Sequence, residues 1–239
     1  FSEKLKQCKM FLFPSPHNPG GMVWSRETLE KVSHYCQQAG VIILSDEVHS
    51  DLTLPGKRHL PFFTLDEATG SQSIVLTSIS KTFNTAAIQG GIAIIKNDEL
   101  RHQFYGFLDN CYLAETHSLQ QAAIYSAFTH CGDWHQKLLA YLADNVAFVK
   151  SEIEKHCPLI SIVYGGASYL LFLNAEKMNL SDEQLSAFFV KEAKLGLSPG
   201  AQYGPGGEGH MRLNVGCPRS VLVEAMNRLK AAYQKRQNA

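Results

Sequence analysis

The sequence predicts an α/β protein whose parallel-rich sheet is followed by a smaller α+β domain. Short aliphatic runs alternate with amphipathic helical stretches through the first hundred residues, and such alternation is typical of β-α-β units. These runs are continuously apolar, which indicates strands covered on both faces of the sheet. From residue 134 a long helical stretch leads to a second group of strands, so we expect domains at 1–133 and 134–239.

The composition agrees with this fold and excludes several classes of protein. The chain has 239 residues, of which 45% are hydrophobic, enough for one large domain or two smaller ones. Lys+Arg and Asp+Glu number 22 each, so no charge excess points to nucleic acid or an anionic membrane as partner. The longest apolar runs have about four to six residues, whereas a membrane helix needs about 20.

Six scattered cysteines and the amino terminus favour a cytoplasmic location. The cysteines form no Cys-x-x-Cys pair, which favours reduced thiols over a disulfide framework or a zinc site. Residues Phe1–Lys4 show no signal-peptide pattern. We therefore expect a cytoplasmic protein without a metal site. The cysteines are Cys8, Cys36, Cys111, Cys131, Cys157 and Cys217.

The elements of the first half follow from apolar runs and capping residues. Ser25 can begin a helix and Gly40 can end it, because the apolar residues between them recur on one helical face. After Asn97 the periodicity becomes helical, and the last of three helices links to the smaller domain. The expected strands span 10–13, 41–45, 74–78 and 92–95, and the expected helices span 97–111, 118–130 and 134–156.

The smaller domain is expected to combine three strands with two helices. Ser181 and Gln184 fit a capping box at the start of one helix. A Gly/Pro-rich loop at 200–209 precedes the last strand, and Pro218 begins the last helix. The expected strands lie near 159–164, 168–174 and 210–215.

Lys81 is the most informative residue, because it follows a predicted strand within the string Ser-Ile-Ser-Lys-Thr-Phe-Asn. A lysine there can reach a ligand at the carboxyl edge of an α/β sheet, where ligands of such folds bind. Lysine also forms Schiff bases with pyridoxal phosphate (PLP). Three more polar residues lie at or just beyond other predicted strands: Asn18, Asp46 and Arg212.

In this order the four residues resemble the site of the fold-type-I PLP enzymes, the class I/II aminotransferase superfamily. The resemblance covers the whole chain and implies a PLP-dependent transferase-like fold. It also implies a partial PLP-binding domain at 1–133, and a linking helix with a small domain at 134–239. Family members carry an amino-terminal segment with a phosphate loop and a stacking ring. We therefore expect residues 1–239 alone to be a weak or inactive catalyst with part of the sheet uncovered.

Longer strings resemble one subfamily, the MalY/PatB-like cystathionine β-lyases, which are carbon–sulfur lyases. One string is Pro16–Gly21, continued by Val23 and Trp24. The other string is Asp46–Leu52, with His59 and Pro61 beyond it. These strings indicate the subfamily more specifically than the four site residues do.

The resemblance implies a role for each site residue, beside a plainer alternative. Asp46 would keep the pyridine nitrogen of PLP protonated and so strengthen its electron sink, or would only cap nearby backbone. The amide of Asn18 would donate to the phenolic oxygen of PLP, or would only shape a turn. Lys81 would hold PLP and then remove the substrate Cα proton, or is an ordinary surface lysine after a strand. Arg212 would hold the substrate carboxylate as a bidentate fork, or is an ordinary exposed arginine.

Other positions carry weaker signals. His49 stands where many aminotransferases have a tyrosine that contacts the phenolic oxygen. Ser78 matches a phosphate-contacting position and Ser80 can assist it, unless both hydroxyls only satisfy local backbone groups. Gln89 replaces a phosphate-binding arginine of many aminotransferases, which disfavours a transaminase. Two tyrosines flank a Gly-Gly turn, and either line the substrate side or pack in the core: Tyr164 and Tyr169.

The leading hypothesis is a PLP-dependent carbon–sulfur β-lyase. It would cleave L-cystathionine or related cysteine S-conjugates to a thiol, pyruvate and ammonia. An aminotransferase of the same fold is the first alternative. A regulatory protein without a catalytic role is the second, because some MalY-like proteins act on a transcriptional activator. We expect a homodimer for the full-length protein, since a second subunit usually completes such active sites.

Overall fold

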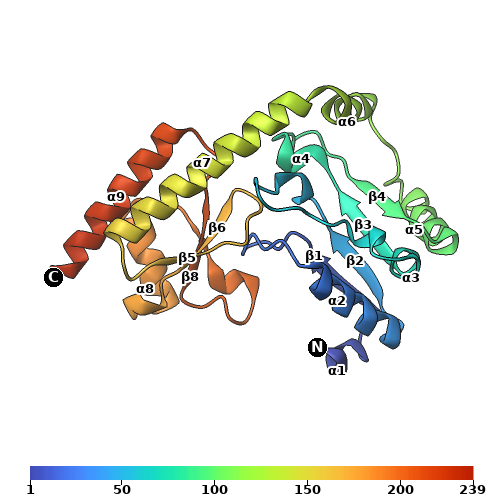
Figure 1. The fold of residues 1–239 in the computed structure, drawn as a ribbon, viewed down its shortest axis with the longest axis horizontal. Coiled ribbons are helices and arrows are strands. Elements are labelled where there is room, and N and C mark those ends of the chain that lie inside the picture. Colours follow the sequence, from blue (N-terminus) through green and yellow to red (C-terminus); the bar gives the residue numbers. More distant parts are fainter. Residues whose placement is uncertain (239) are drawn as a thin grey trace. The chain divides into compact units, whose positions relative to one another are not determined.

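The computed structural model describes residues 1–238, which form two compact units (Figure 1). Unit 1 comprises Phe1–His17 and Val23–Lys137, and unit 2 comprises Asn18–Met22 and the chain from Leu138 onwards. The boundary falls inside helix α7 (Gly132–His156). The assignment of Asn18–Met22 to unit 2 is a feature that the sequence did not indicate.

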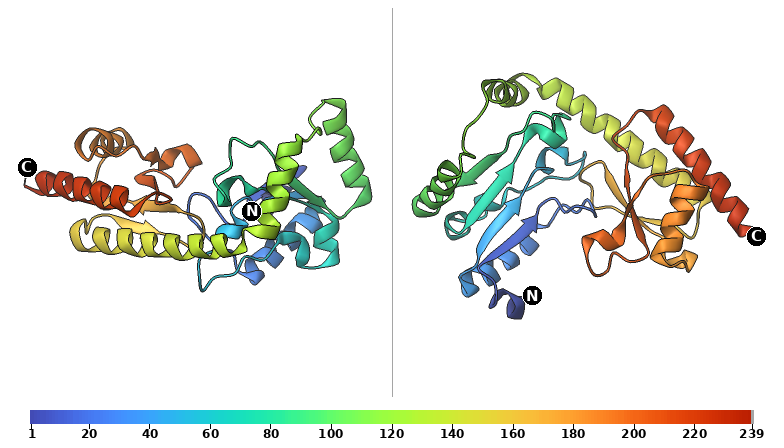
Figure 2. Two further views of the ribbon diagram at one scale, coloured as in Figure 1. Left: turned by 90° about the horizontal axis from the view of Figure 1, so that it is seen from above. Right: turned by 180° about the vertical axis from the view of Figure 1, so that it is seen from behind.

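Unit 1 is built on a four-stranded sheet in the order β1-β2-β3-β4 (Figures 1 and 2). The first three strands are parallel, and β4 is antiparallel to β3. The register pairs Pro14 with Asp46, and Asp46 with Leu76, so the three parallel strands end at one edge. The strands are β1 (Met10–Pro14), β2 (Ile42–Asp46), β3 (Ser73–Thr77) and β4 (Ile92–Ile95).

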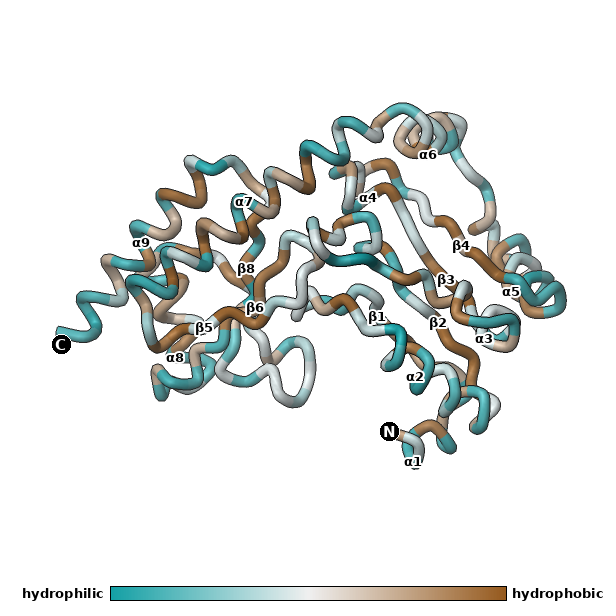
Figure 3. Tube along the Cα trace, in the orientation of Figure 1, coloured by the Kyte–Doolittle hydropathy of each residue, from teal (hydrophilic) through white to brown (hydrophobic). Residues whose placement is uncertain are grey.

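One face of this sheet packs against helix α2 (Arg26–Ala39). The Ser25 side chain accepts a hydrogen bond from Thr28 N at the start of the helix, and Gly40 ends it with a φ of 64°, as the sequence predicted. Figure 3 shows hydrophobic residues concentrated along the strands. The core between helix and sheet consists of Leu5, Phe13, Leu29, Cys36, Val41, Ile43, Phe62 and Val75.

The opposite face of the sheet is only partly covered among the described residues, although the apolar strands predicted cover on both faces. Leu12 lies on the edge strand β1 and is 66% exposed. Other large apolar side chains are exposed on α5 (Asp98–Asn110), on α6 (Ser118–His130) and between them. They are Tyr105, Phe107, Tyr112, Leu113, Leu119, Tyr125 and Phe128.

Unit 2 contains an antiparallel sheet in the order β5-β6-β8-β7, with its own core. Its strands are β5 (Ser161–Val163), β6 (Leu170–Asn174), β7 (Ser198–Pro199) and β8 (His210–Asn214). Buried residues of α7 and of two later helices complete this core. Those helices are α8 (Asp182–Ala187), which has the predicted capping box, and α9 (Arg219–Gln237), which follows Pro218.

Short elements connect these parts, and the sequence did not predict them. Single helical turns follow the carboxyl ends of β2 and β3, where the predicted site residues lie. They are α1 (Ser2–Leu5), η1 (Ser50–Leu52), η2 (Phe62–Thr64), α3 (Glu67–Ser71), α4 (Ile79–Thr82), η3 (Glu176–Met178), η4 (Phe188–Glu192) and η5 (Gly200–Tyr203).

Backbone contacts hold the segment Asn18–Met22 within unit 2. Gly165 N donates to Gly20 O at 3.2 Å, and Ala167 N donates to Gly21 O at 3.0 Å. Gly21 has a φ of +59°, and a Cβ there would lie 2.7 Å from the Ala167 carbonyl oxygen. Only glycine fits this close approach without strain.

Asn145 is a testable anchor of unit 2. It is fully buried in α7, donates to Val215 O and Cys217 O at 3.0 Å each, and accepts from Arg219 Nε at 2.9 Å. Asn145→Ala leaves these buried groups without partners, so we expect the free energy of unfolding to fall by about 2–4 kcal/mol. Chemical denaturation measures this change. The exposed neighbour Asp144 provides the control, and an Asp144→Ala variant with an equal loss would contradict the account.

Candidate active site

The carboxyl ends of β2 and β3 carry most of the site residues that the sequence predicted for unit 1. Asp46 is the last residue of β2, and its Oδ1 accepts a hydrogen bond from Val48 N at 3.2 Å. Ser78 follows β3, and Lys81 lies in the last turn of α4. Parallel pairing of these neighbouring strands therefore brings the two polar segments to the same edge of the sheet.

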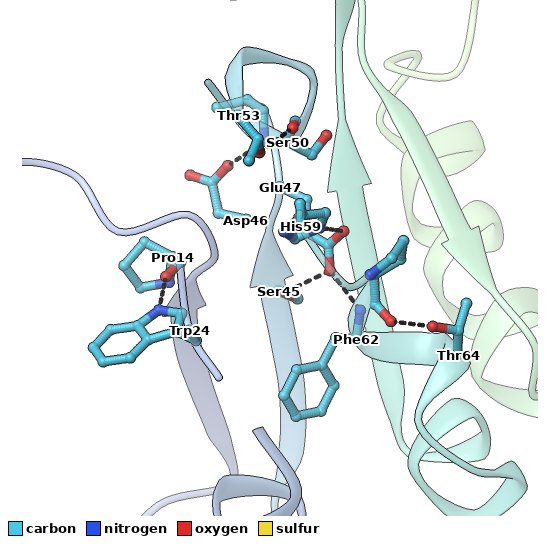
Figure 4. A network of polar contacts seen from close by, with 12 residues as sticks. Pro14, Trp24, Ser45, Asp46, Glu47, Ser50, Thr53, His59, Phe62 and Thr64 are labelled. Carbon is cyan, nitrogen blue, oxygen red and sulfur yellow. Dashed lines mark hydrogen bonds and ion pairs between the residues drawn. The ribbon is translucent and has the colours of Figure 1, made fainter. Parts of the chain in front are cut away.

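Asp46 and Glu47 leave the chain toward opposite faces, because successive side chains of a strand alternate. Asp46 is exposed on the face that is only partly covered. Glu47 is buried on the face that packs against α2, and Figure 4 shows the two carboxylates pointing away from each other. Asp46 is thus the carboxylate that an added ligand can reach.

Ser78 caps α4 and orders the chain around Lys81. Its Oγ accepts from Ser80 N at 3.1 Å and donates to Gly90 O at 2.7 Å. The Ser78 hydroxyl therefore bonds to local backbone groups, which was the alternative to a phosphate contact. A hydroxyl has a single proton to donate, so Ser78 has to release Gly90 before it can donate to a phosphate. The Lys81 side chain is exposed in the same short helix.

A cavity of about 1030 Å³ opens beside these residues in unit 1. Ser78, Ser80 and Gln89 supply polar groups to its wall. The apolar part comes from β3, β4, α5 and the residues before α6. Gly90 packs so tightly on the buried Gln120 side chain that a Cβ there would lie 2.1 Å from the Gln120 amide nitrogen.

A buried polar network behind Asp46 was not predicted as part of the site. The Glu47 carboxylate accepts hydrogen bonds from Ser45 Oγ at 3.0 Å and from Phe62 N at 2.8 Å (Figure 4). His59 Nε2 lies 2.7 Å from the second carboxylate oxygen. The string Asp46–Leu52 with His59 contains both residues, but only the folded structure shows that their side chains meet.

Asp51 lies in η1, close to this network. Its pKa is raised, first because burial disfavours the charged carboxylate, although His135 and His59 nearby act in the opposite direction. The His135 ring also bonds to the Asp51 carbonyl oxygen at 2.5 Å, which ties the first turn of α7 to η1. His49 is buried at the start of the same turn.

The second predicted string shapes the chain after β1. The Trp24 indole donates to Pro14 O at 3.0 Å (Figure 4). Its ring also stacks on Phe13, with centroids 5.6 Å apart. His17 meets Trp24 edge-on at 5.8 Å, and burial lowers the pKa of His17. The ordinary turn predicted for Asn18-Pro19 contains a cis peptide bond between these two residues.

In unit 2 the structure brings Asn18 and Arg212 together. Arg212 Nη1 donates to Asn18 Oδ1 at 3.1 Å, and Nη2 donates to Ser198 Oγ at 3.4 Å. The guanidinium lies over the Tyr203 ring, 5.1 Å from its centroid. These contacts hold the arginine side chain in one orientation, as a fork for a carboxylate requires. Ser198 and Tyr203 could not be predicted from the sequence, because their role depends on tertiary contacts with Arg212.

The two tyrosines of the Gly-Gly turn differ in their surroundings. Tyr164 donates its hydroxyl to Ser168 O at 2.7 Å, and burial raises the pKa of Tyr164 strongly. Burial also raises the pKa of Tyr169, while the charge of Arg212 acts against this rise. Of the two tyrosines, Tyr169 is therefore the one whose pKa is affected by the charge of Arg212. A substrate role for either tyrosine stays a prediction.

Comparison with known proteins identifies the family. Residues 1–229 match the family described as aminotransferase class I and II. The chain therefore belongs to this family, and the predicted fold class, that of the PLP-dependent transferases, is confirmed by its structural neighbours.

Individual relatives are more specific. Over 223 residues the chain is 37% identical to cystathionine beta-lyase PatB of Bacillus subtilis, covering 93% of this chain and 58% of that protein. It is 33% identical to protein MalY of Escherichia coli, covering 92% of this chain and 56% of MalY. The chain thus spans little more than half the length of these relatives.

The crystal structure of cystalysin from Treponema denticola, which contains pyridoxal 5′-phosphate, has the same fold. It superposes with a TM-score of 0.94 at 29% identity, covering 98% of this chain and 61% of cystalysin. A PLP-bound putative aminotransferase from Clostridium difficile also superposes with a TM-score of 0.94, at 30% identity, covering 97% of this chain and 60% of that one. The proteins that this chain resembles therefore include one named as a lyase and one named as a putative aminotransferase.

The raised pKa of Asp51 predicts a pH-dependent gain from Asp51→Asn. A carboxyl whose pKa is raised on folding binds its proton more tightly when folded. Its stabilising contribution is therefore complete below the unfolded pKa and is lost as the pH rises through the folded pKa. Asp51→Asn should stabilise the protein at neutral pH, and the gain should disappear below about pH 4. Thermal unfolding across this range measures it, with exposed Asp109→Asn as control. A pH-independent effect would argue against the burial of Asp51.

Proposed function

We propose that the chain is part of a PLP-dependent carbon–sulfur β-lyase that cleaves L-cystathionine or related cysteine S-conjugates. The observation that carries this proposal is the 37% identity to cystathionine beta-lyase PatB over 93% of the chain. The position of Lys81 just beyond β3 supports it, because that edge of the sheet is where a ligand binds in such folds.

The residues present in unit 1 fit PLP as a cofactor. Asp46 offers an exposed carboxylate, which suits a protonated pyridine nitrogen. The wall of the cavity offers the Ser80 hydroxyl and the Gln89 amide as donors to a phosphate. Ser78 can join them once it exchanges its bond to Gly90. Lys81 supplies the exposed amine that holds the cofactor covalently.

PLP supplies an electron sink for a carbanion at the substrate Cα when it is bound. Lys81 would hold the cofactor through its amine and would accept the substrate Cα proton. The Asp46 carboxylate would pair with the ring nitrogen and so favour its protonated form. His49 and Asn18 are proposed to orient the phenolic oxygen side of the cofactor.

Arg212 is proposed to bind the substrate α-carboxylate. Its contacts to Asn18, Ser198 and the Tyr203 ring leave the guanidinium oriented before a substrate arrives. An oriented donor pair loses little freedom on binding, so it holds the reacting Cα in one pose. That pose decides whether a leaving group on Cβ departs or the carbanion is reprotonated.

An aminotransferase is the second candidate. The fold shared with the PLP-bound putative aminotransferase favours it. Gln89 argues against it, because an amide lacks the charge with which the arginine of many aminotransferases clamps the phosphate.

A homodimer in the cytoplasm completes the proposal. The exposed apolar side chains of α5 and α6 in unit 1 support association, because a water-exposed apolar patch is usually covered by a partner. Among residues 1–238, no helix is long and apolar enough to cross a bilayer. All six cysteines are unpaired thiols, as is usual in a reducing compartment.

The cofactor position is tested by chemical trapping. Borohydride reduction of the PLP-loaded, full-length protein should fix the cofactor on the peptide that contains Lys81, because a reduced imine cannot exchange. Peptide mass spectrometry locates the label, and Lys81→Ala should abolish it. Label on exposed Lys57, or on Lys96, which pairs with Glu67, would show that the cofactor site is elsewhere.

The reaction type is tested by product analysis. Full-length enzyme given L-cystathionine should release homocysteine, pyruvate and ammonia without an added oxo acid. Arg212→Lys should weaken transition-state stabilisation by about 1–3 kcal/mol, because the bidentate fork is lost. Arg228→Lys on the exposed face of α9 is the matched control. Inert cystathionine together with amino exchange to 2-oxoglutarate would establish the aminotransferase instead.

A further inference from the structure

The hydrogen-bonded pair of Glu47 and His59 has no part in the proposed chemistry, although it adjoins residues that do. Both side chains are nearly inaccessible, at 3% exposure for Glu47 and 8% for His59. A carboxylate buried this deeply requires donors around it. Its three partners come from different stretches of chain: the end of β2, the loop before η2, and η2 itself.

These bonds close the chain from Glu47 to Phe62 into one loop. Within it Ser50 N donates to Glu47 O at 2.9 Å, and Leu52 N donates to His49 O at 3.0 Å. His49 therefore lies in a loop that starts at Glu47 and is bonded back to the Glu47 carboxylate at His59 and Phe62. Loss of these two carboxylate bonds would release the His59–Phe62 end of the loop.

Glu47 is joined directly to Asp46, and backbone bonds hold the peptide between them. The carbonyl of Asp46 accepts from Ser15 N at 2.9 Å, and Glu47 N donates to Leu76 O at 2.8 Å. The peptide between Asp46 and Glu47 is thus held by both neighbouring strands. Because the Glu47 side chain is fixed on the covered face, the Asp46 side chain is confined to the opposite face.

We propose that Glu47 and His59 form a positioning pair, which holds Asp46 and His49 in place for the cofactor. This rests on the proposed function, because it assigns the pair to the PLP site. A pair with a purely structural role stabilises the fold without affecting how PLP is bound. The two roles therefore differ in a property that can be measured on folded variants.

The experiment uses His59→Gln, His59→Leu and Glu47→Gln in the full-length protein. Exposed His34→Gln on α2 is the control for loss of an imidazole. The readouts are the PLP dissociation constant, the visible absorption maximum of bound PLP and its pH dependence, and hydrogen exchange across residues 46–62. Glutamine at position 59 keeps a donor, so it should rescue part of what leucine loses.

The expected result is a PLP dissociation constant raised about tenfold in His59→Leu and Glu47→Gln, which corresponds to about 1.4 kcal/mol. A shifted absorption maximum and faster exchange at 46–62 should accompany it, and His59→Gln should lie between. Folded variants that lose stability but keep the affinity and spectrum of PLP would overturn the proposal. If His59→Leu does not fold, His59→Gln decides. Failure of the unaltered protein to bind PLP would overturn the proposed function as well, and that failure is visible without any variant.

Discussion

Parallel hydrogen bonding between β1, β2 and β3 sets which side chains of unit 1 can meet a ligand. The register that pairs Pro14 with Asp46, and Asp46 with Leu76, ends all three strands at one edge. A slip of one residue in β2 would exchange the faces of Asp46 and Glu47. It would bury one carboxylate without its donors and expose the other, so the register and the site depend on each other.

Glu47 shows how the fold accommodates a charge beside its core. Its burial is compatible with a stable fold only because Ser45, His59 and the Phe62 amide surround it. The loop between β2 and η2 has to follow a fixed path to bring the last two donors there. Asp46, one residue earlier, has no such requirement and remains accessible.

Unit 2 prepares an arginine in a comparable way, from elements far apart in sequence. Arg212 is fixed on β8 by antiparallel pairing with Phe172 and Ser198. Asn18 reaches it because the segment Asn18–Met22 is attached to the Gly-Gly turn of this unit. The close approach at Gly21 is what permits that attachment.

The sequence predicted the long elements because their signals are local. Continuous apolar runs defined the strands, and Ser25, Gly40 and Ser181 defined helix ends. The Glu47–His59 pair was missed because its two residues stand 12 apart and only burial distinguishes them from surface charges. The bonds of Ser78 to its own loop were foreseen only as an alternative.

Local sequence patterns also could not predict that one face of the unit 1 sheet is only partly covered. Leu12 has the same residue type as a core position, and its exposure depends on what packs against β1. Apolar character therefore predicts a strand well, but it does not reveal which surface is covered within a given stretch of chain.

A crystal structure of the PLP-loaded, full-length protein would show whether the ends of β2 and β3 form the cofactor site. We predict PLP joined to Lys81 Nζ, with the Asp46 carboxylate at the ring nitrogen and Glu47 still bonded to His59. PLP bound at another lysine, or bound with Asp46 directed away from its ring, would contradict it.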